Sequence, residues 1–109
     1  MKIEHIGIAI KSLETSDHLF ARLLGKHSYK QESVEREGVT TSFYEVGESK
    51  IELLEATNPE SPIAKFLDKR GEGVHHIAFG VENIYTEIER LKEEGFVFIS
   101  EEPKDGADN

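Results

Sequence analysis

Two short apolar segments that each begin with a histidine most constrain how this chain can fold. One begins at His5 and the other at His76, and a shift of 71 positions superposes them. Each is followed by a helical pattern of apolar residues that ends at a glycine, Gly25 in the first half and Gly95 in the second. This internal repeat predicts two copies of one supersecondary unit.

Hydrophobic periodicity and turn residues predict the elements of each copy. The expected strands are residues 3–10, 28–34, 39–46, 50–55, 73–81 and 96–99, with a charged hairpin turn at 35–38. The expected helices run from Ser12 or Thr15 to Gly25, from Ser61 and Pro62 through Leu67, and over 84–94. The first half is therefore a βαβββ unit, whereas the second half reaches Asn109 after the first of its three later strands.

These elements predict an α+β fold of paired βαβββ modules in which the second module is incomplete. At 109 residues the chain has the length of a single domain. We divide it into a first module at 1–57, a connector at 58–73 and a partial second module at 74–109. Two such modules placed back to back would align their sheets around a shared cavity.

The histidines of the two modules define a candidate metal site. Side chains alternate between the two faces of a strand, so His5 shares a face with the small residues Gly7 and Ala9, which leave room for a pocket. His75 and His76 are expected to point to opposite faces. A single histidine in a strand is more often structural, but the repeat makes His76 the equivalent of His5, and this pairing favours a functional site.

Glu52 is unusual because it lies between Ile51 and Leu53 in an expected strand. If that strand is central, the ionised carboxylate needs a cation or several hydrogen-bond donors to offset its desolvation. If this face of the sheet is exposed to water, Glu52 needs neither. The sequence pattern leaves both possibilities open.

Composition excludes several classes of protein and of site. The chain has no cysteine, so any metal would be bound by histidine and by carboxylate or amide oxygens. A net charge of −9 argues against nucleic acids and anionic membranes as partners. No apolar run approaches the ~20 residues of a membrane span. The N-terminus has no signal-peptide hydrophobic region, so a cytoplasmic location is expected.

Five segments carry a resemblance to a known family. They are HIGIAI at 5–10, KIELLE at 50–55, SPIAKFL at 61–67, GEGVHHIAF at 71–79 and EEPK at 101–104. Together they resemble the methylmalonyl-CoA epimerases, members of the vicinal oxygen chelate superfamily, which also contains glyoxalases and bleomycin-resistance proteins. The resemblance extends over nearly the whole chain and implies the superfamily's paired βαβββ fold.

The resemblance also implies a set of site residues. His5, Glu52 and His76 would bind a divalent metal ion, with cobalt expected first and manganese, nickel or zinc as alternatives. His75 would be structural or would contact a ligand without binding the metal ion itself. The family's fourth ligand is a glutamate in a later strand, beyond Asn109. Thr41 stands where some family members have a glutamate base, and threonine cannot remove a proton from carbon.

The implied reaction is the interconversion of the 2R and 2S forms of methylmalonyl-CoA. The proton between the thioester and the carboxylate is removed, and the metal ion stabilises the resulting enolate. The sequence assigns no catalytic base, and Glu52 and Glu45 are the candidates. Because CoA thioesters and this chain are both acidic, local cations would have to compensate. The basic cluster nearest to the proposed pocket in sequence is Lys65, Lys69 and Arg70, and the alternative role of each is that of a solvated surface residue. A homodimer is expected, as is common in the superfamily.

Three alternatives remain open. A glyoxalase-type isomerase would use the same fold and a similar metal ion, but it would act on a glutathione hemithioacetal. A metal-free small-molecule binding module would hold no ion, and the histidine pair argues against it. An inactive chain would lack the final strands and present an unpaired sheet edge that promotes pairing between chains.

Overall fold

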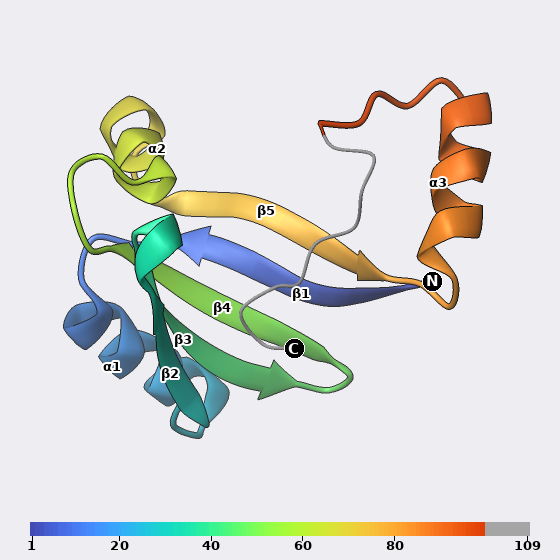
Figure 1. The fold of residues 1–109 in the computed structure, drawn as a ribbon. Helices are drawn as coiled ribbons and strands as arrows, with labels where there is room; N and C mark the ends of the chain where they lie inside the picture. Colours follow the sequence, from blue (N-terminus) through green and yellow to red (C-terminus); the bar gives the residue numbers. More distant parts are fainter. Residues whose placement is uncertain (100–109) are drawn as a thin grey trace.

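The computed structural model describes residues 1–99 and shows a five-stranded sheet with three α-helices and one short 3-10 helix (Figure 1). In chain order the elements are β1 (Lys2–Ala9), α1 (Leu13–Leu24), β2 (Lys30–Val34), η1 (Glu35–Glu37), β3 (Val39–Val46), β4 (Ser49–Ala56), α2 (Pro62–Arg70), β5 (Gly73–Gly80) and α3 (Ile84–Glu93). The first five elements besides η1 form the predicted βαβββ unit, and β5 and α3 begin the same order again. The predicted α+β class is confirmed.

The sheet has the strand order β2-β3-β4-β1-β5. β1 is parallel to β4, which the chain reaches through α1 and the β2–β3 hairpin, and the other neighbouring pairs are antiparallel. β1 therefore lies between a strand of its own module and the first strand of the second module. This arrangement puts the two histidine strands side by side, as the repeat predicts (Figure 1).

Polar side chains begin the helices by accepting hydrogen bonds from free N–H groups. Ser12, rather than Thr15, caps α1, since its hydroxyl accepts from the N–H of Thr15 at 3.3 Å. Ser61 caps α2 in the same way, through the N–H of Ala64 at 3.1 Å, and Pro62 occupies the first turn. No helix within residues 1–99 combines the length and the apolar character needed to cross a membrane.

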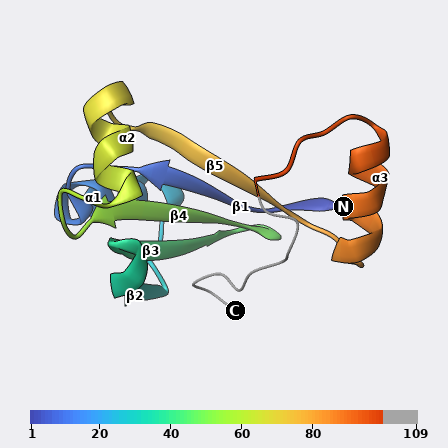
Figure 2. The same cartoon turned by 45° about the horizontal axis from the view of Figure 1, so that its top comes forward.

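Helices α1 and α2 pack against opposite faces of the sheet. The face under α2, which we call the inner face, has a buried cluster of Ala9, Val39, Leu54 and Ile63. The face under α1, the outer face, has a buried cluster of Ile10, Leu13, Tyr44 and Leu53. Helix α3 stands at the far end of the sheet from α2 and buries none of its residues (Figure 2).

The prediction of a strand at 96–99 is wrong. Phe96, Val97 and Ile99 are 61%, 96% and 107% exposed. The repeat makes this segment the equivalent of β2, whose neighbour in the sheet is β3. Residues 1–99 contain no equivalent of β3 in the second half, so the segment has no strand with which to exchange backbone hydrogen bonds.

Candidate metal centre

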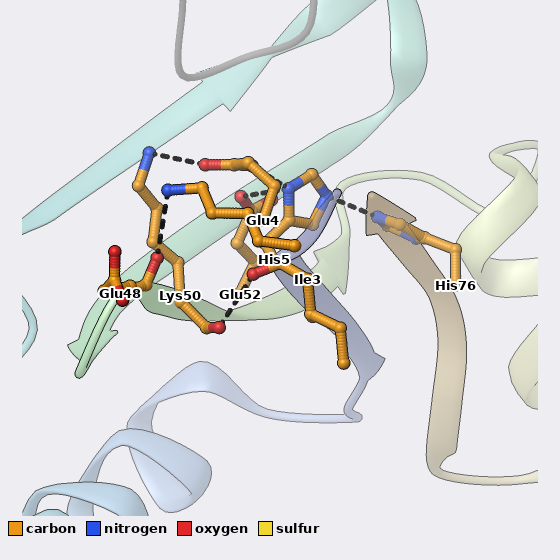
Figure 3. A network of polar contacts seen from close by, with 9 residues as sticks. Ile3, Glu4, His5, Glu48, Lys50, Glu52 and His76 are labelled. Atoms are coloured by element: carbon orange, nitrogen blue, oxygen red, sulfur yellow. Dashed lines mark hydrogen bonds and ion pairs between the residues drawn. The ribbon is translucent and has the colours of Figure 1, made fainter. Parts of the chain in front are cut away.

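Three side chains with metal-binding atoms meet on the inner face: His5 from β1, Glu52 from β4 and His76 from β5 (Figure 3). One ligand atom of each lies within 4.8 Å of those of the other two. The Nε2 atoms of His5 and His76 are 3.0 Å apart, and Nδ1 of His5 is 3.3 Å from Oε2 of Glu52. The structure thus brings together all three residues that the sequence predicted as ligands.

Gly7 makes this convergence possible. In the sheet register, Gly7 lies beside Glu52 on one side and beside His76 on the other. A Cβ atom at residue 7 would lie 2.2 Å from Cε1 of His76, so the His76 ring occupies the space above the glycine. The missing side chain therefore allows the ring to approach His5 across β1.

The position of Glu52 answers the question that the sequence left open. β4 is an interior strand of the sheet, and Glu52 is 6% exposed. A carboxylate in this position requires partners that offset the loss of hydration. The nearby imidazole of His5 is one such partner, and a cation held between them would be a stronger one.

The electrostatic environment of His76 favours the form that binds metal ions. Burial is the largest cause that lowers the pKa of His76, and the charges of His5 and His75 lower it further. A lowered pKa keeps the imidazole neutral at neutral pH. A neutral imidazole has a free nitrogen lone pair, as metal binding requires.

The prediction that His75 and His76 face opposite sides of β5 is wrong. The pairing of β1 with β5 shifts register between Gly7 and Ile8, so that His75 is left unpaired in a β-bulge. A bulge can turn two consecutive side chains to one face, and the Nδ1 atoms of His75 and His76 are 3.0 Å apart. Strict alternation fails here because it assumes a continuous ladder.

A second register shift, between Ile3 and His5, brings Glu4 into the site. Oε1 of Glu4 accepts a hydrogen bond from Nδ1 of His5 at 2.6 Å, and this bond is the largest cause of the lowered pKa of Glu4. Lys50 lowers that pKa as well, with its Nζ 3.1 Å from Oε2 of Glu4. Sequence reasoning missed Glu4 because a strand without a bulge would direct it to the outer face.

The three residues fit a divalent metal ion. Two nitrogens bound to one ion at about 2.0–2.1 Å, with an angle between 90° and tetrahedral, lie roughly 2.9–3.4 Å apart. The 3.0 Å between the two Nε2 atoms falls within that range. Imidazole and carboxylate ligands suit several divalent ions of the first transition series, so this ligand set does not choose among them.

The remaining residues named from the sequence lie on or near the same face. The β3–β4 register places Thr41 beside Leu54 and Glu45 beside Lys50, with Thr41 buried and Glu45 exposed. Helix α2 packs on the inner face and carries three exposed basic residues, Lys65, Lys69 and Arg70.

Glu32 of β2 is an inner-face carboxylate that sequence reasoning missed. It pairs directly with Thr41 across the β2–β3 hairpin. Its Oε1 atom is buried and has no hydrogen-bond partner among residues 1–99. The signal was present in the sequence, since Glu32 shares its strand parity with Val34, which packs against the inner cluster.

Comparisons with known proteins agree with this fold. A family model described as the Glyoxalase/Bleomycin resistance protein/Dioxygenase superfamily matches residues 4–109. The ethylmalonyl-CoA/methylmalonyl-CoA epimerase of Cereibacter sphaeroides is 39% identical over 97% of this chain and 81% of its own length. The mitochondrial methylmalonyl-CoA epimerase of Bos taurus is 34% identical over 97% of this chain, which spans 61% of that protein.

Two solved structures show the same similarity in three dimensions. A hypothetical protein of Bacillus halodurans C-125 has a TM-score of 0.92 and 47% identity, over 98% of this chain and 78% of the other. A Streptomyces coelicolor methylmalonyl-CoA epimerase in complex with 2-nitronate-propionyl-CoA has a TM-score of 0.84 and 31% identity, over 98% and 78%. The chain therefore belongs to the glyoxalase, bleomycin resistance protein and dioxygenase superfamily and is similar to its methylmalonyl-CoA epimerases.

Proposed function

We propose that this chain interconverts the 2R and 2S forms of methylmalonyl-CoA on the inner face of its sheet. The observation that carries the proposal is the convergence of His5, Glu52 and His76 in a chain similar to epimerases. The ligand of the Streptomyces relative supports it, because a nitronate is a planar anion like the enolate left when an α-proton is removed. The relatives named methylmalonyl-CoA epimerase act on a CoA thioester, and removal of its α-proton likewise leaves an enolate.

The three ligands would hold a divalent metal ion through Nε2 of each histidine and a carboxylate oxygen of Glu52. Such an ion offsets the negative charge that develops on the thioester oxygen as the proton leaves. The inner face would orient the carbon that loses its proton.

Proton transfer requires carboxylates near that carbon. Glu52 and Glu45 are the candidates from the sequence, but Glu52 is also a proposed ligand. Glu32 joins them because its buried Oε1 atom has no hydrogen-bond partner within the described residues 1–99 and lies on the same face, beside the residue that stands in the family's base position. Glu32 pairs with Thr41 from the neighbouring strand β2, whereas Glu45 lies further along β3 on the same face, and we propose these two carboxylates for the role that Thr41 cannot take.

The acidic chain must also accept a negatively charged thioester. The exposed cations of α2, Lys65, Lys69 and Arg70, are the proposed contacts for the phosphates of CoA, since they lie on the helix beside the inner face. We further propose a cytoplasmic homodimer as the working form.

Deuterium exchange tests the proposed reaction. The cobalt-loaded protein, incubated with methylmalonyl-CoA in D₂O, should incorporate deuterium at C2. H76A should lose at least ~100-fold of this exchange while keeping its circular dichroism spectrum. Of E32Q and E45Q, the variant that lacks the base should lose a similar factor at unchanged cobalt affinity.

Wild-type protein that binds cobalt but catalyses no exchange would contradict the proposed reaction. Ethylmalonyl-CoA, assayed beside methylmalonyl-CoA, measures the breadth of acyl groups accepted. A glutathione hemithioacetal distinguishes the alternative glyoxalase-type isomerase, because that activity would appear in the absence of thioester exchange.

A further inference from the structure

The two ligand histidines share a local construction that the repeat reveals. Glu4 precedes His5, His75 precedes His76, and the shift of 71 positions superposes the two pairs. Each preceding residue is the unpaired member of a register shift between β1 and β5. The antiparallel pair β1–β5 thus contains two bulges, one on each strand, and each bulge lies directly before a ligand.

Each bulged residue holds the Nδ1 atom of the ligand that follows it. Oε1 of Glu4 lies 2.6 Å from Nδ1 of His5, and Nδ1 of His75 lies 3.0 Å from Nδ1 of His76. A carboxylate accepts only, so His5 donates from Nδ1 to Glu4. If His75 accepts in the same way, both ligand rings carry their proton on Nδ1 and present a free Nε2 lone pair to the shared site.

Both bulged side chains are themselves fixed by a second contact. Oε2 of Glu4 is 3.1 Å from Nζ of Lys50, which belongs to β4 beside β1 (Figure 3). The ring of His75 lies edge-on to Phe66 of α2, with centroids 5.0 Å apart. Each bulged side chain thus makes a second contact besides the one to the nitrogen of the ligand.

We propose that Glu4 and His75 are positioning residues, which fix the ring orientation and the tautomer of His5 and His76 so that both Nε2 atoms face one divalent metal ion. This assignment rests on the proposed metal site. Without the bulges, Glu4 and His75 would point to the outer face, and the ligand rings would lose these contacts to Nδ1. Hydrogen-bond partners of this kind typically change metal affinity about 10- to 100-fold.

Paired variants at each position separate hydrogen bonding from charge and from packing. E4Q removes the charge but keeps an oxygen that accepts a hydrogen bond, whereas E4L removes both. H75N keeps an acceptor near the place of Nδ1, whereas H75F keeps the ring against Phe66 and removes the acceptor. E82Q, at an exposed glutamate beyond β5, is the matched control for loss of charge.

Cobalt titration by calorimetry, without substrate, gives the first readout. We expect E4L and H75F to bind cobalt about 10- to 100-fold more weakly, with E4Q and H75N much closer to wild type. Equal losses in E4Q and E4L would show that Glu4 acts by charge alone, and equal losses in H75N and H75F would show that His75 only packs. Either result would overturn the assignment for that residue.

Nitrogen-15 NMR of the zinc-loaded protein gives the second readout. His5 and His76 should show the Nδ1–H tautomer, and His75 the Nε2–H tautomer. An Nε2–H tautomer at His5 or His76 would overturn the proposal. The proposed reaction and the proposed role of Glu4 and His75 can be distinguished by their failures. If the wild-type protein binds no cobalt, both proposals are wrong. If it binds cobalt but catalyses no exchange of the thioester, only the proposed reaction is wrong.

Discussion

At the scale of single residues, the candidate site depends on the lack of a side chain at Gly7. Gly7 is flanked in the sheet by Glu52 and His76, and the His76 ring covers it. Its role is therefore steric, since a Cβ atom added at residue 7 would meet the ring of His76, a proposed ligand, rather than the core. Glycine in a strand interior ordinarily weakens the strand, so its presence here agrees with a site that needs close approach.

G7A should displace the His76 ring, because the new Cβ atom would lie 2.2 Å from Cε1 in the present geometry. We expect cobalt affinity to fall at least ~10-fold, since one ligand moves while the strand remains able to form. Calorimetric titration measures the affinity, and circular dichroism checks the fold. G73A is the control, because a Cβ atom at Gly73 meets no atom within 4 Å. Equal affinities in G7A and wild type would show that the ring is not held above residue 7.

At the scale of elements, hydrogen bonds to the side chain of Asp17 connect α1 to the outer face of the sheet. Asp17 accepts hydrogen bonds from Ser42 at 2.7 Å and from Tyr44 at 2.5 Å through Oδ1, and from Gln31 at 2.9 Å through Oδ2. Ser42 and Tyr44 are 0% and 1% exposed, so both hydroxyls depend on this acceptor. The helix that follows the first histidine strand is thereby docked onto β2 and β3.

Burial, together with the neighbouring Asp17, raises the pKa of Tyr44 to about 12. The folded state thus favours the neutral phenol, and the resulting stability is complete below the unfolded pKa near 10 and is lost as pH rises toward 12. We expect the difference in unfolding free energy between wild type and Y44F to shrink by roughly 1 kcal/mol between pH 9 and pH 11. Urea unfolding at both pH values measures it, and Y85F, at an exposed tyrosine, should show no such change. A difference that stays constant with pH would contradict the shifted pKa.

At the scale of the whole molecule, the candidate metal site joins strands from both modules. His5 and Glu52 come from β1 and β4 of the first module, and His76 comes from β5 of the second. An ion bound to all three would hold β5 against the first module in addition to the β1–β5 ladder. Ligand binding that occurs only in the folded state raises its stability by mass action.

Cobalt at about 100 times its dissociation constant should therefore raise the unfolding free energy by roughly 2.7 kcal/mol. Chemical unfolding with cobalt and with a chelator measures the increment. H76A should lose most of it because the link from β5 disappears, whereas H18A, at an exposed histidine of α1, should keep it. An increment of equal size in H76A would place the ion elsewhere.

The sequence by itself predicted the repeat and the order of the elements as far as α3, because strand alternation, helical periodicity and capping residues act over short stretches of chain. The repeat also paired His5 with His76 as candidate ligands, whereas Glu52 joined them only through the resemblance to the epimerases. It also identified Ser61 and Gly25 as helix boundaries, which are local signals. It did not find Glu4 or the true direction of His75, because a bulge arises from the pairing of two strands 71 residues apart and leaves no mark on either alone. Tertiary structure also decided whether residues 96–99 form a strand, because a strand needs a neighbouring strand for its backbone hydrogen bonds. It likewise decided the burial of Glu52, because a face of a sheet is buried only where other elements pack on it.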